Sequence, residues 1–324
     1  MPGASSAQLH PHPAIAQTPL PPRIGTLELK PMTSPTHSSP FDRRIEDVGN
    51  IVEFGHVNVR VPDQQIAIVF YVMGLGLTRD PYLVTGVENA WMNVGTSQFH
   101  LPVGPAQVVR GAIGLVMPDL EALVERLEEV RPRLTGTRFG FVADRAQVEV
   151  TCPWGNRIRV HAPDPKRFGP LLLGMPYVEL DVPSGTTARI ERFYREMLGA
   201  LTSSGTDFVR VNAGKNESLV YRETTRAIPP YDGHHLQITV ADFSGVHRKL
   251  GERGLISEES SQSQYRFENI VDLDTGAVLL SLEHEVRSLR HPLHGRYLVN
   301  RNPAINNNWF ATGHEVALWH TGPE

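Results

Sequence analysis

The sequence predicts an α+β fold in which four βαβββ modules pair into two domains. Three observations lead to this prediction. First, a short strand with alternating apolar residues recurs four times. Second, each copy ends in a residue that interrupts the strand, followed by an Asp or Ser that can start a helix. Third, a helical pattern follows each copy. Such a repeat indicates a duplicated supersecondary unit. The four strands are HVNVRVPD (56–63), AIGLVMPD (112–119), YVELDVPS (177–184) and HLQITVAD (235–242).

A helix is predicted after each of these strands. In the first and third copies the helix ends alike, in FYVMGLG (70–76) and FYREMLG (193–199). The last glycine of each motif is typical of a helix C-terminus, where the backbone turns left-handed. The four predicted helices cover residues 63–76, 119–130, 187–199 and 242–254.

Strand-like segments follow each helix and complete the βαβββ order. The pairs Gly155-Asn156 and Thr275-Gly276 are typical of tight hairpin connections. The strand-like segments lie at 90–101, 147–162, 207–223 and 266–285.

The modules predict two paired-module domains, over residues 50–165 and 172–290. The Pro-rich segment 163–170 is the predicted linker between them. Residues 1–48, rich in Pro, Ser and Thr, are predicted to be a disordered arm. Residues 291–324 form a C-terminal tail, whose Trp309 and Trp319 suggest docking on a partner subunit in a homo-oligomer.

The composition of the chain argues against several classes of function. The 324 residues are 40% hydrophobic and 20% charged, with a formal net charge of -4, which favours a packed protein without nucleic acid or membrane partners. The single cysteine excludes an intramolecular disulfide and a cysteine zinc cage. No apolar run has the length of a membrane span, and no secretory signal is evident, so we expect a cytoplasmic protein.

The repeat resembles the vicinal oxygen chelate superfamily, which includes glyoxalase I, bleomycin resistance proteins and extradiol ring-cleaving dioxygenases. The resemblance covers about residues 50–290. It is carried by FGHVNVRVPD (54–63), the two glycine-ended helix motifs, CPWGNRIRV (152–160) and DLDTGAVLLSLEHE (272–285). The resemblance implies that paired modules form cup-shaped mixed sheets. It also implies a divalent metal, bound by the first and last strands of paired modules, that chelates two neighbouring oxygens of a small substrate.

This resemblance implies the metal ligands His56, His100, His235 and Glu283. His56 and His235 stand at the first-strand position, and His100 lies in the last strand of module one. Modules two and three offer no suitable residue: their corresponding positions hold Ala112, Arg159, Tyr177 and Tyr221.

The carboxylate has a register problem. Counting from Gly276 as from Gly155 places Leu280 in the ligand position, so an inserted residue or bulge is needed to turn Glu283 inward. Glu285 and His284 remain alternatives.

The pairing of the modules also stays open. If modules one and four share a site, all four ligands meet. If modules one and two pair, as in extradiol dioxygenases, each cup holds at most two ligands, too few for a firm metal site.

The tail EHEVRSLRHPLHGRYLVNRNP (283–303) follows the last strand and is rich in Arg and His. One interpretation places it over the site, with Tyr297 or His291 as a catalytic acid or base and an arginine binding a substrate carboxylate. The alternative is a packing tail that covers the sheet edge.

The first hypothesis for function is an Fe(II)-dependent extradiol-type dioxygenase acting on a catechol-like aromatic with vicinal oxygens. His56, His235 and Glu283 would be ligands, and His100 a fourth ligand or an acid/base catalyst. The lack of a histidine at Tyr177 argues against it, because extradiol enzymes have their first ligand there. The alternatives are a glyoxalase- or isomerase-type lyase with Zn or Ni, with Mn a further choice of metal, and a metal-free small-molecule binding protein.

Overall fold

The computed structural model describes residues 41–83, 86 and 88–301. Most of the predicted N-terminal arm, and the tail from residue 302 with Trp309 and Trp319, lie outside these residues. Within them, no helix is long and apolar enough to cross a membrane.

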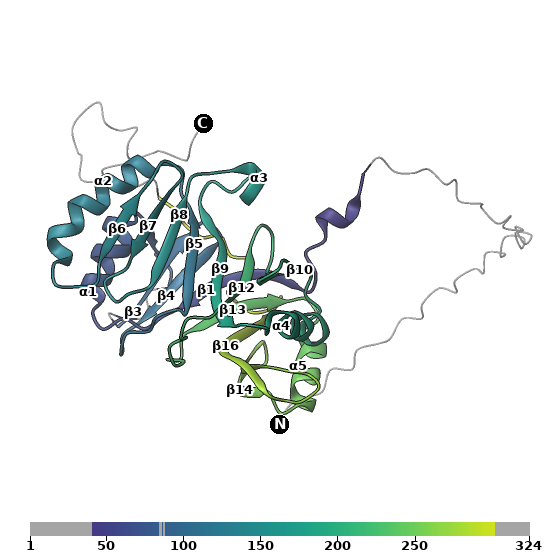
Figure 1. Ribbon diagram of the computed structural model, residues 1–324. Coiled ribbons are helices and arrows are strands. Elements are labelled where there is room, and N and C mark those ends of the chain that lie inside the picture. The colour runs from purple at the N-terminus through teal and green to yellow at the C-terminus, as the bar shows by residue number, and fades with distance from the viewer. Residues whose placement is uncertain (1–40, 84–85, 87, 302–324) are drawn as a thin grey trace, which may run out of the picture. The chain divides into compact units, whose positions relative to one another are not determined.

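The first sheet joins modules one and four (Figure 1). Its centre is the antiparallel pairing of the first strands of the two modules, in which His56 lies opposite Gln237 and Asn58 opposite His235. The last strand of each module then pairs in parallel with its first strand. In sheet order the strands are β14 (Ile256–Ser261), β15 (Gln264–Val271), β16 (Val278–Ser288), β13 (His235–Val240), β1 (Ile51–Asn58), β4 (Ser97–Pro102), β3 (Asn89–Val94) and β2 (Thr78–Arg79).

The second sheet joins modules two and three in the same way. Its central antiparallel pair places Gly114 opposite Tyr177 and Ala112 opposite Glu179. Its strands in order are β10 (Thr202–Ser204), β11 (Phe208–Asn212), β12 (Ser218–Thr224), β9 (Gly174–Pro183), β5 (Gly111–Val116), β8 (Arg157–His161), β7 (Gln147–Thr151) and β6 (Gly140–Ala143).

The α+β fold of four βαβββ modules in two mixed sheets is therefore confirmed. The pairing differs from the predicted division into paired-module domains at 50–165 and 172–290, because each sheet takes one module from either side of the linker. The physical reason for this pairing is the hydrogen bonding between first strands: β1 is hydrogen-bonded to β13, and β5 is hydrogen-bonded to β9. This is the arrangement that brings modules one and four together.

Three of the four repeat helices begin at a capping Asp, and the first and third are followed by a glycine, as the repeat predicts. The third begins at Thr186 without a side-chain cap, so the predicted helix-starting role of Ser184 is wrong. Asp63, Asp119 and Asp242 each accept backbone N–H groups of the first helical turn. Gly76 and Gly199 take positive φ angles of 77° and 66° after the helix. The helices are α1 (Gln64–Ala67) with the π-helix η2 (Ile68–Gly74), α2 (Leu120–Val130) with the 3-10 helix η3 (Arg131–Leu134), α4 (Thr187–Phe193) with the π-helix η4 (Tyr194–Leu198), and α5 (Phe243–Glu252). Two short ones are the 3-10 helix η1 (Arg43–Glu46) and α3 (Pro165–Phe168) in the linker.

One hydrophobic core extends over both sheets and their helices. Strand alternation sends one set of side chains into this core, for example Val57, Phe99 and Leu236 of the first sheet. The intervening positions therefore face the other way, and in both sheets they carry mostly polar and charged side chains.

Candidate metal centre

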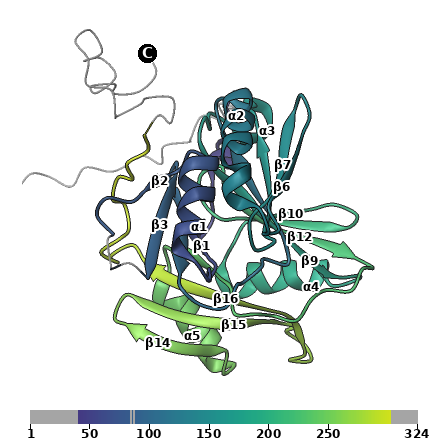
Figure 2. The same cartoon turned by 90° about the vertical axis from the view of Figure 1, so that its left-hand side faces the viewer.

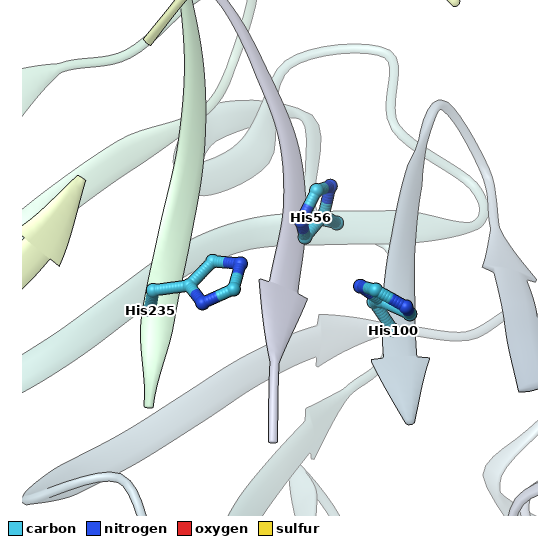
Figure 3. Close-up of side chains that lie close together, drawn as sticks. All are labelled: His56, His100 and His235. Carbon is cyan, nitrogen blue, oxygen red and sulfur yellow. The ribbon is translucent and has the colours of Figure 1, made fainter. Parts of the chain in front are cut away.

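Three histidines lie on neighbouring strands at the centre of the first sheet (Figure 3). His56 is near the end of β1, His100 is on β4, and His235 begins β13. Asn58 is the strand partner of both His100 and His235, so the three rings project from the same face of the sheet. We call this surface, formed by His56, Gln98, His100, His235 and Gln237, the histidine face.

The imidazole rings converge. One ring nitrogen of each histidine lies within 4.8 Å of the corresponding atoms of the other two. The ring of His56 is 5.5 Å from that of His100 and 5.7 Å from that of His235, between centroids. Buried polar atoms are normally hydrogen-bonded, yet the Nε2 atoms of all three histidines are buried without a partner. Three converging imidazole rings, each with an unsatisfied nitrogen, fit a divalent metal ion.

The protonation of these rings suits a metal. Burial lowers the pKa of His56 well below its ordinary value, that of His100 to about 3 and that of His235 to about 2. The positive charges of Arg266 and Arg287 lower these pKa values further. All three rings are therefore neutral at pH 7, the form in which imidazole binds metals.

Neighbouring side chains orient His100. The side-chain amide of Asn58 lies 2.6 Å from its Nδ1 atom. The near atom of the amide is Nδ2, which donates to Nδ1; exchange of the amide oxygen and nitrogen would let the ring donate its Nδ1 proton and leave Nε2 as a free ligand. The indole of Trp91 stacks on the ring at 3.7 Å between centroids, with 11° between the planes. His100 is thus held in one orientation from two sides.

Two carboxylates reach the centre from β16. Glu283 Oε1 is 3.3 Å from His235 Nδ1, and Glu285 Oε2 is 3.7 Å from His235 Nε2. The strand register distinguishes them. In module four, Glu285 pairs with Gln237, which corresponds to the pairing of His100 with Asn58 in module one. Glu283 pairs with His235, which corresponds to the pairing of Gln98 with His56. Glu285 therefore occupies the position in module four that His100 occupies in module one.

Ordinary strand alternation turns both carboxylates toward the histidine face, because Leu280, Leu282 and Val286 of β16 lie in the core. Between the pairs Phe267–His284 and Asn269–Ser281, β16 advances three residues while β15 advances two. This extra residue shifts the register, as a bulge does. Leu280, the position found by counting from Gly276, instead pairs with Ile270. His284 points into the core, where it stacks on Phe267.

Both carboxylates already form ion pairs. Arg266 lies 2.9 Å from Glu283 and 2.9 Å from Glu285, and Arg287 lies 2.7 Å from Glu285. Burial raises the pKa of Glu283, and Arg266 opposes this effect. A metal at the histidines would therefore compete with two arginines for a carboxylate ligand.

The tail after β16 crosses the first sheet and runs beside β3 (Figure 2). His294 Nδ1 lies 2.7 Å from Glu53, and Arg296 lies 2.6 Å from Asp80. Between this tail and the sheet is a cavity of about 30 Å³, lined by residues that include His56, Arg287 and His294.

Of the predicted catalytic residues, His100 lies in the histidine cluster, and the other two lie in the tail. Tyr297 is 96% exposed, and His291 is half-buried, with its Nδ1 accepting the backbone N–H of Leu293. The sequence interpretation missed His294 and Arg296 as the residues that turn inward. In a segment without helix or strand periodicity, no sequence signal reveals which side chain faces the sheet.

The corresponding surface of the second sheet carries different residues. Tyr177 stands where His235 stands in the first sheet, Ala112 where His56 stands, and Arg159 where His100 stands. The fourth position is Val220, since Tyr221 points into the core. Over residues 41–83, 86 and 88–301, the three histidines are the one group with the spacing of a metal site.

No protein-family model and no curated protein matches the chain. Among solved structures, a candidate dioxygenase from Bacillus subtilis is similar, with 15% identity, coverage of 74% of this chain and 86% of that one, and a TM-score of 0.49. Glyoxalase I from Zea mays shares 15% identity over 73% of this chain and 92% of its own, with a TM-score of 0.47. A 2,3-dioxygenase from Pseudomonas sp. KL28 shares 14% identity over 78% and 95%, with a TM-score of 0.29. The strand order of its own two sheets gives this chain a fold of four paired βαβββ modules.

Proposed function

We propose that this chain is a metal-dependent enzyme that binds a divalent ion at His56, His100 and His235 and acts on a small molecule with two adjacent oxygens. The observation that supports it is the convergence of three rings, each with one nitrogen within 4.8 Å of the other two, together with a buried Nε2 atom on each ring that has no hydrogen-bond partner. Glu285 is the fourth ligand by its position in the strand register, and Glu283 is the alternative that the sequence favours.

The reaction we propose first is extradiol-type ring cleavage of a catechol-like aromatic with Fe(II). Bound Fe(II) would supply open coordination positions for two substrate oxygens and the redox chemistry that dioxygen requires. The chain itself supplies the positive side chain of Arg287 at the cavity, suited to an anionic substrate or product. The pair His294–Glu53 lines the same cavity and can hold the proton that a substrate hydroxyl gives up.

The tail must move for an aromatic ring to lie against His56 from the side of this cavity. A volume of about 30 Å³ holds one or two water molecules and no ring. Leu293, His294, Arg296 and Leu298 form the tail side of the cavity, so substrate entry there requires this segment to be displaced.

A glyoxalase- or isomerase-type lyase is the second candidate. The ion pairs of Glu283 and Glu285 favour this candidate. They occupy both carboxylates, so the three histidines, whose Nε2 atoms have no hydrogen-bond partner, are left as the metal ligands. Three histidines suit Zn(II), which polarises a carbonyl without redox chemistry.

Metal content is the test. The full chain is purified anaerobically without chelator and analysed by mass spectrometry, beside His56→Ala, His235→Ala and the control Tyr177→Phe at the matching position of the second sheet. We expect about one divalent ion per chain in wild type and control, and none in the two histidine variants. Absence of metal from the wild type after reconstitution would contradict both enzyme proposals and leave a metal-free binding protein.

Oxygen uptake separates the two reactions. Iron-loaded protein should consume dioxygen with catechols, with formation of a yellow ring-opened product. Metal binding without oxygen uptake, together with isomerisation of a 2-oxoaldehyde thiol adduct, would favour the lyase.

A further inference from the structure

The second sheet carries a much larger cavity than the first. Its volume is about 780 Å³, and it is lined from β7, β8, β9, β11 and β12 and by residues around α3. This volume lies within the range of small-molecule binding sites. We call this surface, lined by Arg159, Arg167, Arg210, Arg222, His161 and Tyr177, the arginine face.

The inner part of the arginine face is an ion-paired framework. Glu179 lies 2.9 Å from Arg159 and 3.0 Å from Arg222, and its side chain is 11% exposed. One carboxylate thus holds two guanidinium groups in fixed positions, which favours directed recognition of a ligand.

Two further arginines lining the cavity have no carboxylate partner among the described residues. Arg210 donates to the hydroxyl of Ser218 at 2.7 Å, and Arg167 lies over the ring of Phe168 at 4.7 Å. Both residues are exposed and so available to a ligand, although partial burial of the Arg210 guanidinium lowers its pKa. Four guanidinium groups face the three carboxylates of Glu149, Glu179 and Glu217, which gives the cavity an excess of positive charge.

A buried histidine adds an unsatisfied polar atom to this cavity. His161 is 3% exposed, and its Nε2 lies 2.8 Å from the hydroxyl of Tyr177. Its Nδ1 is buried and has no hydrogen-bond partner. An atom of this kind in the wall of a cavity is normally satisfied by a ligand or by water.

We propose that the arginine face binds a small organic anion with a carboxylate or phosphate group, directly and without a metal. Arg167 and Arg210 contact the anionic group, and the ring of Phe168 packs against the carbon skeleton. The metal-ligand positions of this sheet hold Ala112, Arg159 and Tyr177, so the site does not depend on the function proposed for the histidine face.

Calorimetric titration of the full chain tests this proposal. The probes are inorganic phosphate, glycerol 3-phosphate, malonate and citrate, with glycerol as the neutral control. We expect at least one anion to bind, with affinity that falls at least tenfold in both Arg167→Gln and Arg210→Gln. Tight binding of the two phosphates alone, or of the two carboxylates alone, identifies the anionic group.

Two controls make the result specific. Arg195→Gln, an exposed arginine on η4, should retain wild-type affinity. His56→Ala should also retain it, which separates this site from the histidine face. Lack of binding by all four anions, or binding that both cavity variants leave unchanged while their circular dichroism is native, would overturn the proposal.

Discussion

The two sheets present the same backbone positions with different chemistry. His56, His100 and His235 occupy three strand positions of the first sheet. The corresponding positions of the second sheet hold Ala112, Arg159 and Tyr177, in that order. Strand pairing fixes where these side chains point, because alternation and register are the same in both sheets. The side chains then decide the ligand: neutral imidazoles suit a metal, and guanidinium groups suit an anion.

The two faces also differ in what covers them. The tail segment around His294 and Arg296 packs over the first sheet and leaves about 30 Å³, whereas the second sheet keeps a cavity of about 780 Å³. A duplicated fold has thus diverged at two levels, in the residues at the ligand positions and in access to them.

The largest expected difference concerns the carboxylate at the centre of each face. Glu285 is 4% exposed between the half-buried Arg266 and Arg287, and its loss leaves Arg287 beside Arg266, which keeps its ion pair with Glu283. We expect Glu285→Gln to lower the free energy of unfolding by about 2–3 kcal/mol. Glu179→Gln acts on the more exposed Arg159 and Arg222 and should cost about 1 kcal/mol.

Urea denaturation of the metal-free variants measures both losses. Equal losses would show that the charged networks of the two faces are buried alike in solution, and the comparison would fail.

A second prediction concerns Glu217, which links the two faces. It lines the cavity of the second sheet and accepts hydrogen bonds from Ser97 Oγ at 2.8 Å and the backbone N–H of Phe54 at 3.2 Å, both in the first sheet. Burial raises its pKa from 4.5 to about 7. A raised carboxyl pKa contributes stability that is complete below pH 4.5 and is lost as the pH rises through 7.

Glu217→Gln removes this dependence on pH. We expect the free energy of unfolding of the variant, relative to wild type, to rise by up to about 3 kcal/mol between pH 4.5 and pH 8. Denaturation curves at a series of pH values measure the difference in unfolding free energy between variant and wild type. The contributions of the other titrating groups cancel in this difference. A difference that stays constant with pH would mean that Glu217 is ionised as easily in the folded chain as in the unfolded one.

Much of the fold could be predicted from the sequence because the repeat is local. Alternation, a capping Asp and a glycine at the helix end each specify one element; the alternation recurs in all four copies and the capping Asp in three. The pairing of β1 with β13 could not be predicted, because it depends on which strand edges meet in space. The inventory of histidines in modules one and four pointed to it only indirectly.

The site could be predicted in part, for similar reasons. His56 and His235 share a position in a recognisable strand pattern, and the structure places them together with His100. The choice between Glu283 and Glu285 depends on which of them pairs with Gln237 of β13, and no residue type reveals that register. The roles of His291 and Tyr297 stay predictions, and the geometry favours His294 and Arg296 as the tail residues nearest the sheet.

The smallest expected effect concerns the tail that covers only the histidine face. Arg296 lies 2.6 Å from Asp80, which is 1% exposed but also accepts the backbone N–H groups of Tyr82 and Leu83. Because Asp80 keeps these partners, Arg296→Gln should cost only about 1–2 kcal/mol, and this cost should appear as local opening of the tail.

Amide hydrogen exchange at Arg301, whose N–H donates to Thr78, measures that opening. It should become roughly tenfold faster in Arg296→Gln, since about 1.4 kcal/mol corresponds to a factor of ten. Tyr297→Phe is the matched control, because the adjacent side chain is 96% exposed. If Tyr297→Phe opens the tail and Arg296→Gln does not, Tyr297 is the residue that holds the tail down. The access that distinguishes the two faces would then be set by the hydroxyl of Tyr297 and not by the Arg296–Asp80 ion pair.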